Sequence, residues 1–126
     1  MLSGLRVLIV EDEPVLADDL SEIIAEAEGL VVGPVATVKE ARALIKGGVA
    51  FDVAVLDVNL TDGVVTPVLE ALQARGVPVL VYTGGTVPDD VRQRHPSLVS
   101  LTKPVRPARL TGEIRRVARK ADQGAT

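Results

Sequence analysis

Five short apolar runs recur along this chain, and they constrain its fold more than any other feature. They cover residues 5–10, 30–35, 53–56, 77–82 and 98–101. Each run is rich in Val, Ile and Leu, is too short for a typical helix and is bounded by polar or turn-forming residues, so we interpret all five as strands. The stretches that follow them carry apolar residues at helical spacing, most clearly at Leu16, Leu20, Ile23 and Ala27, at Val38, Ala41, Leu44 and Ile45, and at Leu110, Ile114 and Val117.

The order of these elements predicts an α/β fold. Strands that are apolar without interruption are typical of a parallel sheet covered by helices on both faces, so we expect a doubly wound (βα)5 domain. Helix-start signals agree: Pro14 stands where a first helical turn would begin, and Thr37 precedes Glu40 by three residues, as in a capping box. We expect a single domain over residues 1–122 and a disordered tail over residues 123–126.

Composition excludes several classes of protein. The 126 residues include no cysteine, which removes disulfides and thiolate metal sites and agrees with a reducing, cytoplasmic location. The net charge is −3, with one Phe and one Tyr, so neither general attraction to nucleic acid nor a platform for stacking bases is expected. No apolar run approaches the roughly 18–20 residues that span a bilayer. We therefore expect a soluble protein that binds neither membranes nor nucleic acid.

Polar side chains stand at the carboxyl ends of four predicted strands. Glu11 and Asp12 follow the first strand, Asp57 the third, Thr83 the fourth and Lys103 the fifth. Ligands of open α/β sheets bind outside these ends, so we expect three carboxylates, a hydroxyl and an ammonium group to converge on one edge.

This set of groups is suited to phosphoryl chemistry. Carboxylates held close together repel one another unless a cation intervenes, so Glu11, Asp12 and Asp57 predict a hard divalent ion, for which Mg²⁺ fits best. An aspartate such as Asp57 can attack phosphorus as a nucleophile and form an acyl phosphate. Lys103 and Thr83 would then stabilise the phosphoryl oxygens.

The pattern resembles the receiver domains of two-component response regulators. The resemblance rests on four segments in the expected order: VLIVEDEP from Val7, LDVNL from Leu56, YTG from Tyr82 and LTKP from Leu101. It spans residues 5–117 and implies a CheY-like, flavodoxin-like sheet of five parallel strands in the order 2-1-3-4-5. It also implies no enzymatic activity beyond Mg²⁺-dependent self-phosphorylation and self-dephosphorylation.

The resemblance implies a role for each matched position. Asp57 is the phosphoacceptor, Thr83 the switch hydroxyl and Lys103 the lysine that senses the phosphate. The implied metal ligands are Glu11, Asp12, Asp57 and Asn59. Of these, Asp12 is expected to bind the metal directly and Asn59 to offer its backbone carbonyl. A cis peptide bond before Pro104 is also implied.

The chain departs from the usual receiver pattern in several places. Ser100 stands where receivers carry an aromatic switch residue, Gly84 replaces the usual Ala after the fourth strand, and residues 61–63 lack a common proline. These features resemble the variant receivers that are paired with HWE-type histidine kinases, although Thr86 stands where that class has Tyr. The phosphoryl chemistry is therefore better supported than the usual coupling to an output surface.

We expect the chain to accept a phosphoryl group from a histidine kinase, including one of HWE type, or from a histidine phosphotransfer protein. With no attached effector domain in the sequence, we expect signalling through protein–protein contact. A downstream protein or a second copy would use the last helices, where basic residues gather: Arg106, Arg109, Arg115, Arg116, Arg119 and Lys120. The simpler interpretation of this run is a solvated helix face.

Other functions remain as alternatives. A pseudo-receiver would keep the fold and signal by constitutive contact, as the absence of an aromatic at Ser100 suggests. A phosphatase of the haloacid-dehalogenase type needs a second Asp two residues after the nucleophile, and Asn59 stands there. A dinucleotide-binding enzyme is disfavoured because no Gly-x-Gly-x-x-Gly follows the first strand.

Overall fold

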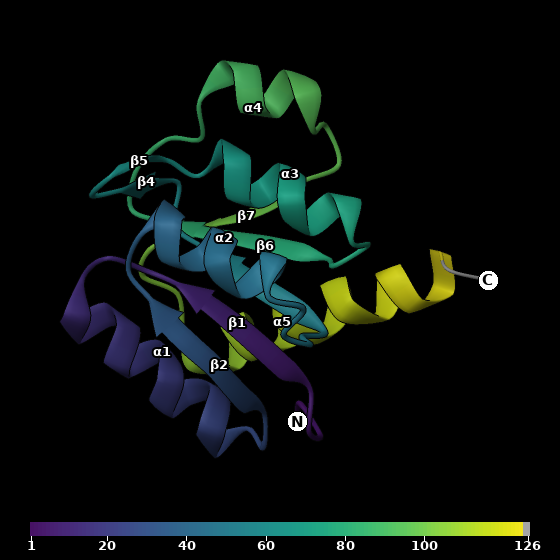
Figure 1. Ribbon diagram of the computed structural model, residues 1–126. Coiled ribbons are helices and arrows are strands. Elements are labelled where there is room, and N and C mark those ends of the chain that lie inside the picture. The colour runs from purple at the N-terminus through teal and green to yellow at the C-terminus, as the bar shows by residue number, and fades with distance from the viewer. Residues whose placement is uncertain (125–126) are drawn as a thin grey trace.

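The computed structural model describes residues 1–124 and shows strands and helices alternating along the chain (Figure 1). The strands are β1 (Arg6–Val10), β2 (Leu30–Val35), β3 (Val53–Leu56), β4 (Asn59–Leu60), β5 (Gly63–Val64), β6 (Val79–Thr83) and β7 (Val99–Thr102). The helices are α1 (Pro14–Glu26), α2 (Val38–Lys46), α3 (Thr66–Ala74), α4 (Asp89–Arg94) and α5 (Pro107–Gly124).

Five strands form one parallel sheet in the order β2-β1-β3-β6-β7. Counting these strands alone, the order is 2-1-3-4-5, so the predicted CheY-like fold is confirmed. β1 pairs with both β2 and β3 and therefore lies inside the sheet. All parallel strands point the same way, so their carboxyl ends meet at one edge.

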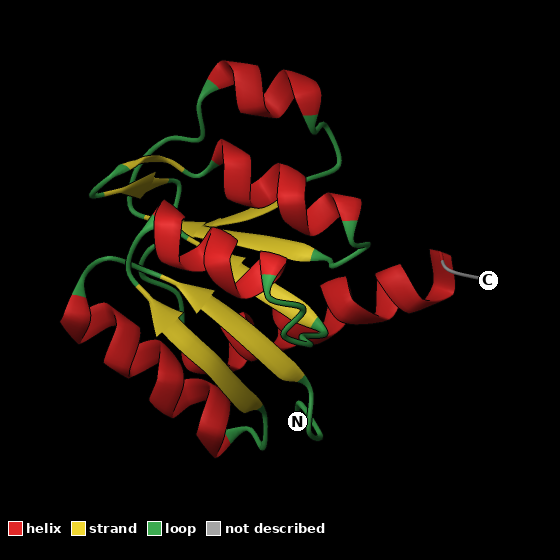
Figure 2. Ribbon diagram, in the orientation of Figure 1, coloured by secondary structure: helices red, strands yellow, loops and turns green. Residues whose placement is uncertain are grey.

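Helices cover both faces of this sheet, as Figure 2 shows. Alternate residues of β1 point to opposite faces, so Val7 and Ile9 pack with the buried side chains of α1 and α5, whereas Leu8 and Val10 pack with those of α2, α3 and α4. Both clusters are aliphatic apart from the buried Phe51 and the partly buried Tyr82. The continuous apolar runs of the sequence follow from this burial on two sides.

The start of α2 shows the expected cap, and the end of α1 shows a left-handed residue that the sequence does not indicate. Thr37 Oγ1 accepts a hydrogen bond from the Glu40 backbone N–H at 3.0 Å, which confirms the capping interaction. After α1, the left-handed residue is Glu28, with φ of 67°. Gly29 is needed for space instead, because a Cβ there would lie 2.7 Å from Ile24 Cγ2.

Two strands begin and end later than the sequence indicates. The predicted strand 77–82 is β6, which starts at Val79 because the Val77 N–H donates to Leu72 O of α3. The fifth predicted strand, 98–101, is β7 and runs one residue further at its end. Helix α5 continues to Gly124, and the rest of the tail expected over residues 123–126 lies outside the described residues.

A short hairpin follows the third strand of the sheet and was not expected from the sequence. β4 pairs with β5 in antiparallel fashion, Asn59 opposite Val64 and Leu60 opposite Gly63. Thr61 and Asp62 form the turn between them. Among residues 1–124, every helix is too short or too polar to cross a lipid bilayer.

Candidate functional site

The edge formed by the strand ends brings together the side chains singled out in the sequence. Glu11 follows β1, Asp57 follows β3, Thr83 is the last residue of β6, and Lys103 follows β7. Glu11 and Thr83 are buried, each with 3% of its surface exposed. Burial of these polar side chains requires hydrogen-bond partners, and the four residues supply them to one another.

Asp57 lies at the centre of the cluster and accepts hydrogen bonds on both carboxylate oxygens. Its Oδ1 accepts from Thr83 Oγ1 at 2.7 Å and from the Val58 N–H at 2.7 Å. Its Oδ2 accepts from Lys103 Nζ at 3.1 Å. Burial acts to raise the pKa of Asp57, but the hydrogen bonds from Thr83 and Lys103 outweigh it and lower the pKa overall. Asp57 is therefore held as a carboxylate at neutral pH.

Lys103 bridges two carboxylates, because its Nζ donates to Glu11 Oε1 as well as to Asp57. Burial acts to lower the pKa of the lysine, but its bonds to Glu11 and Asp57 raise it, so the ammonium form is retained. The lysine follows β7 directly, and its backbone N–H donates to Thr83 O at 2.9 Å. The peptide bond between Lys103 and Pro104 is cis, as the resemblance implies.

The site holds more negative than positive charge. Glu11, Asp12 and Asp57 each bring a carboxylate oxygen within 4.8 Å of the others, and Lys103 pairs with two of them. Burial raises the pKa of Glu11 despite its bond to Lys103, so removal from water disfavours the charged form of this carboxylate. Three hard oxygen donors with incomplete neutralisation fit a divalent cation such as Mg²⁺. Asp12 is the more exposed member of the first-strand pair.

Asn59 and the two glycines after β6 border the same edge. Asn59 is exposed at the start of β4, and a Cβ on Gly85 would lie 3.6 Å from its Nδ2. The Gly85 N–H donates to Thr83 Oγ1 at 3.2 Å, which orients the hydroxyl toward Asp57. The metal-binding role of the Asn59 carbonyl stays a prediction.

Two residues of the β4–β5 turn join the site to its surroundings, and sequence reasoning did not assign them a role. Thr61 Oγ1 donates to Asp12 Oδ2 at 3.2 Å. Asp62 accepts from the backbone N–H groups of Val38 and Lys39, at 2.8 and 3.1 Å, at the start of α2. The Asp62-Gly63 pair is a hairpin signal that could have indicated the turn, but not these partners.

Ser100 occupies the position at which receivers usually carry an aromatic residue, and a small cavity lies beside it. Ser100 is exposed on β7, and a cavity of about 60 Å³ lies beside it, lined also by Val87 and His95. The aromatic ring near the site is Tyr82, whose hydroxyl accepts from the Val105 N–H at 3.2 Å. Lys103 Nζ lies 5.8 Å from the centre of this ring.

Comparison with known proteins identifies the family. The family model described as the response regulator receiver domain matches residues 7–115. The chain belongs to this family. As a receiver domain, it is a component of two-component signalling.

Relatives and solved structures agree with this assignment. The chain is 35% identical over 123 residues to the transcriptional regulatory protein TcrA of Mycobacterium tuberculosis. The match covers 94% of this chain and 48% of TcrA, so the chain spans about half the length of that relative. The solution structure of SdrG from Sphingomonas melonis is 36% identical, with a TM-score of 0.75, covering 94% of this chain and 98% of SdrG.

A third structure shows a similar fold with a metal ion. It is the receiver domain of the sensor histidine kinase PA1611 from Pseudomonas aeruginosa, with magnesium coordinated in its active-site cleft. It is 23% identical, with a TM-score of 0.76, and the match covers 91% of this chain and 98% of that one.

Proposed function

We propose that this receiver domain accepts a phosphoryl group on Asp57 from a phosphohistidine of a histidine kinase or a histidine phosphotransfer protein. The observation that carries the proposal is the set of donors on Asp57, a hydroxyl on Oδ1 and an ammonium group on Oδ2. Groups that hold a carboxylate in this way also match the oxygens of a phosphoryl group attached to it.

The reaction exchanges one bond to phosphorus for another. A carboxylate oxygen of Asp57 attacks the phosphorus, the bond between phosphorus and the donor imidazole nitrogen breaks, and the imidazole keeps the electron pair. Lys103 stays paired with Glu11 and donates to a phosphoryl oxygen. Thr83 turns its hydroxyl from Asp57 Oδ1 to another phosphoryl oxygen. Water then hydrolyses the acyl phosphate, which returns the Asp57 carboxylate and releases inorganic phosphate. The proposal includes no chemistry of the domain beyond self-phosphorylation and self-dephosphorylation.

A magnesium ion is the cofactor of this proposal. The side chains of Glu11, Asp12 and Asp57 and the backbone carbonyl of Asn59 would hold it. When bound, the ion neutralises charge on the phosphoryl oxygens during transfer. Support comes from the cluster of three carboxylates with incomplete neutralisation and from the magnesium in the similar PA1611 receiver.

The proposal extends to partners and location. We place the domain in the cytoplasm, where histidine kinases and phosphotransfer proteins act, and include kinases of HWE type among its donors on the strength of Gly84 after Thr83. Output would pass through protein–protein contact, by a downstream protein or a second copy at the basic α5.

A phosphorylation assay with two matched variants tests the proposal. The protein is incubated with Mg²⁺ and acetyl phosphate, or with a cognate kinase, and the adduct is followed by intact mass and by its lability in base. We expect one phosphoryl group per chain, lost in Asp57→Asn and retained in Asp62→Asn, whose carboxylate lies outside the cluster. Absence of an adduct with both donors, or its persistence in Asp57→Asn, would contradict the proposal and favour a pseudo-receiver.

A further inference from the structure

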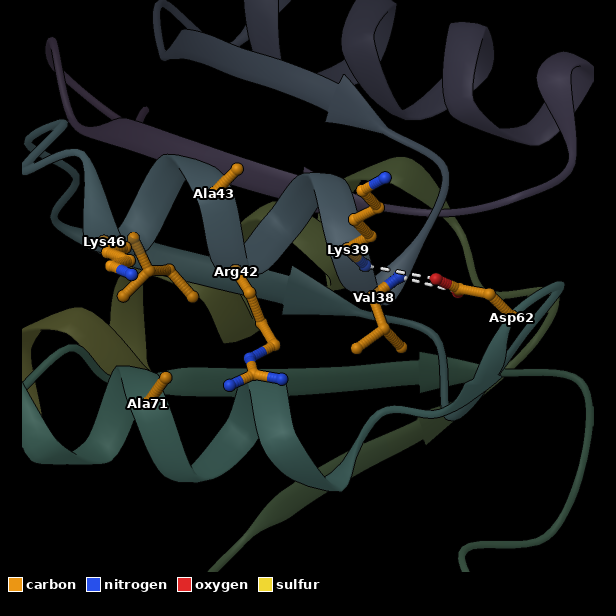
Figure 3. A pocket seen from close by; sticks show the side chains of 8 residues that line it. Val38, Lys39, Arg42, Ala43, Lys46, Asp62 and Ala71 are labelled. Atoms are coloured by element: carbon orange, nitrogen blue, oxygen red, sulfur yellow. Dashed lines mark hydrogen bonds between the residues drawn. The ribbon is translucent and has the colours of Figure 1, made fainter.

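A groove of about 650 Å³ lies between α2 and α3, beside the turn of the β4–β5 hairpin. Val38, Ile45 and Ala71 contribute apolar surface to it, and Lys39 and Arg42 stand among its charged residues. Figure 3 shows Arg42 reaching from α2 toward α3 and Asp62 resting against the first turn of α2. The groove is thus apolar in part and has a basic side formed by charged residues of α2.

The basic side is built by α2 alone and is not neutralised within the described part of the chain. Lys39, Arg42 and Lys46 are spaced by three and four residues, which places them along one side of the helix. All three are exposed, and none forms an ion pair with a residue among 1–120, whose side chains the structure describes. Asp62 is the acidic residue that lines the groove, and both of its oxygens are occupied by α2 N–H groups.

The apolar wall and the three cations indicate which kind of partner the groove can bind. An apolar helix would leave three cations facing it without partners, which is unfavourable. A nucleic acid would meet three cations on a chain of net charge −3, with no aromatic residue in the groove on which a base could stack. A helix with a narrow apolar face flanked by carboxylates matches both the apolar wall and the basic side.

The same hairpin turn that borders the groove also contacts the acidic site. Thr61 bonds to Asp12, and the next residue, Asp62, bonds to the first two N–H groups of α2. A change at Asp12 can therefore be passed to the start of α2 through Thr61 and Asp62, which are adjacent in the sequence. Helix α2 is the one that carries the basic side of the groove. This connection is independent of Ser100 and of β7.

We propose that the groove between α2 and α3 binds an acidic helical segment of a partner protein, and that the β4–β5 turn couples this binding to the state of Asp57. The coupling to Asp57 rests on the proposed function, whereas binding of the helical segment in the groove does not require phosphorylation.

Titration of the ¹⁵N-labelled protein with a short synthetic helical peptide tests the docking surface. The peptide presents leucines on one face and glutamates beside them, and a matched peptide carries glutamine in place of glutamate. We expect saturable shifts confined to α2, α3 and the hairpin, and weaker binding of the glutamine peptide. Arg42→Glu combined with Lys46→Glu should weaken binding by at least about tenfold, since each attraction becomes a repulsion. Arg92→Glu combined with Gln93→Glu, at exposed positions of α4 that do not line the groove, is the control.

Three results overturn the docking surface: no saturable binding up to about 1 mM peptide, equal affinity for both peptides, or equal weakening by the α4 control. Analytical ultracentrifugation excludes a second copy as the occupant if the protein stays monomeric in the absence of peptide. If the protein is instead a dimer, and Arg42→Glu combined with Lys46→Glu converts it to a monomer, the groove binds a second copy of the chain. That result would overturn the proposal of an acidic partner.

The coupling is measured by repeating the titration with Mg²⁺ and beryllofluoride, a phosphoryl mimic. We expect the peptide affinity to change by about threefold or more, and the change to be lost in Asp62→Ala and in Thr61→Val, each checked for folding by its spectrum. If beryllofluoride shifts the signals of Asp57 and Thr83 but leaves the affinity unchanged, the coupling is wrong. If it causes no shifts at these residues, the proposed function fails and the coupling fails with it, while the docking surface is judged by the peptide alone.

Discussion

Replacing Lys103 by Met removes the cation that bridges two carboxylates while keeping an apolar side chain of similar length. The Glu11 side chain is 2% exposed, and those of Asp57 and Lys103 are each 13% exposed. Removing one partner of a fully buried ion pair costs about 3–5 kcal/mol, because the remaining charge is left unpaired. Solvent reaches Asp57, so we expect a loss of about 2–3 kcal/mol in the free energy of unfolding at neutral pH. This corresponds to a fall in Tm of roughly 10 °C for a domain of this size.

The effect of Lys103→Met must also depend on pH. Without the lysine, the pKa values of Glu11 and Asp57 rise, so the folded variant takes up protons at a higher pH than the folded parent. Protonation removes the unpaired charges, and the difference in stability between the two proteins therefore shrinks as pH falls. In the parent, the lowered pKa of Asp57 contributes stability that is present above the ordinary aspartate pKa and is lost as pH falls through the lowered value.

Urea denaturation, followed by circular dichroism at several pH values from about 4.5 to 7.5, measures both effects. Lys120→Met is the control, because Lys120 is exposed on α5, and its loss of stability should stay within about 0.5 kcal/mol. A loss below about 1 kcal/mol for Lys103→Met at neutral pH, or one that is the same at every pH, would refute the assigned role of the lysine in neutralising buried carboxylates.

Further predictions concern four single positions. Thr37→Ala should lower the free energy of unfolding by about 1 kcal/mol in urea, because the hydroxyl caps α2. Gly29→Ala should destabilise by about 1–3 kcal/mol in the same assay, because its Cβ meets Ile24, whereas Gly112→Ala, in open space within α5, should stabilise by about 0.5–1 kcal/mol. Mg²⁺ should raise the Tm of the parent in differential scanning fluorimetry but not that of Asp12→Asn, and an equal rise in both would place the ion elsewhere.

The sequence predicts the sheet well because its three inner strands, β1, β3 and β6, are buried on both faces along nearly their whole length and are therefore apolar runs. Strand ends are less well predicted, since they depend on partners elsewhere: the N–H of Val77 is taken by α3, which delays β6. The hairpin was missed because strands of two residues carry no periodicity. Its turn signal, Asp62-Gly63, indicates a change of direction and nothing more.

The candidate site, like the sheet, was predicted in part from the sequence. Charged and hydroxyl residues after buried strands predict a cluster, and the structure brings Glu11, Asp57, Thr83 and Lys103 together as expected. The pairing of Lys103 with Glu11 could not be predicted, because the sequence does not show that the lysine reaches both carboxylates and bridges them. Asp62 was missed for a different reason, since its partners lie 23 and 24 residues earlier in the chain.

The sheet also acts as a partition between the two sides of the molecule. One aliphatic cluster joins it to α1 and α5, and the other joins it to α2, α3 and α4. The groove between α2 and α3 therefore lies on the opposite side of the sheet from α1 and α5. Asp57 follows β3 at the edge formed by the strand ends, between the two sides. The groove and the surfaces of α1 and α5 lie on separate sides of the sheet, so occupation of one side leaves the helices of the other side exposed.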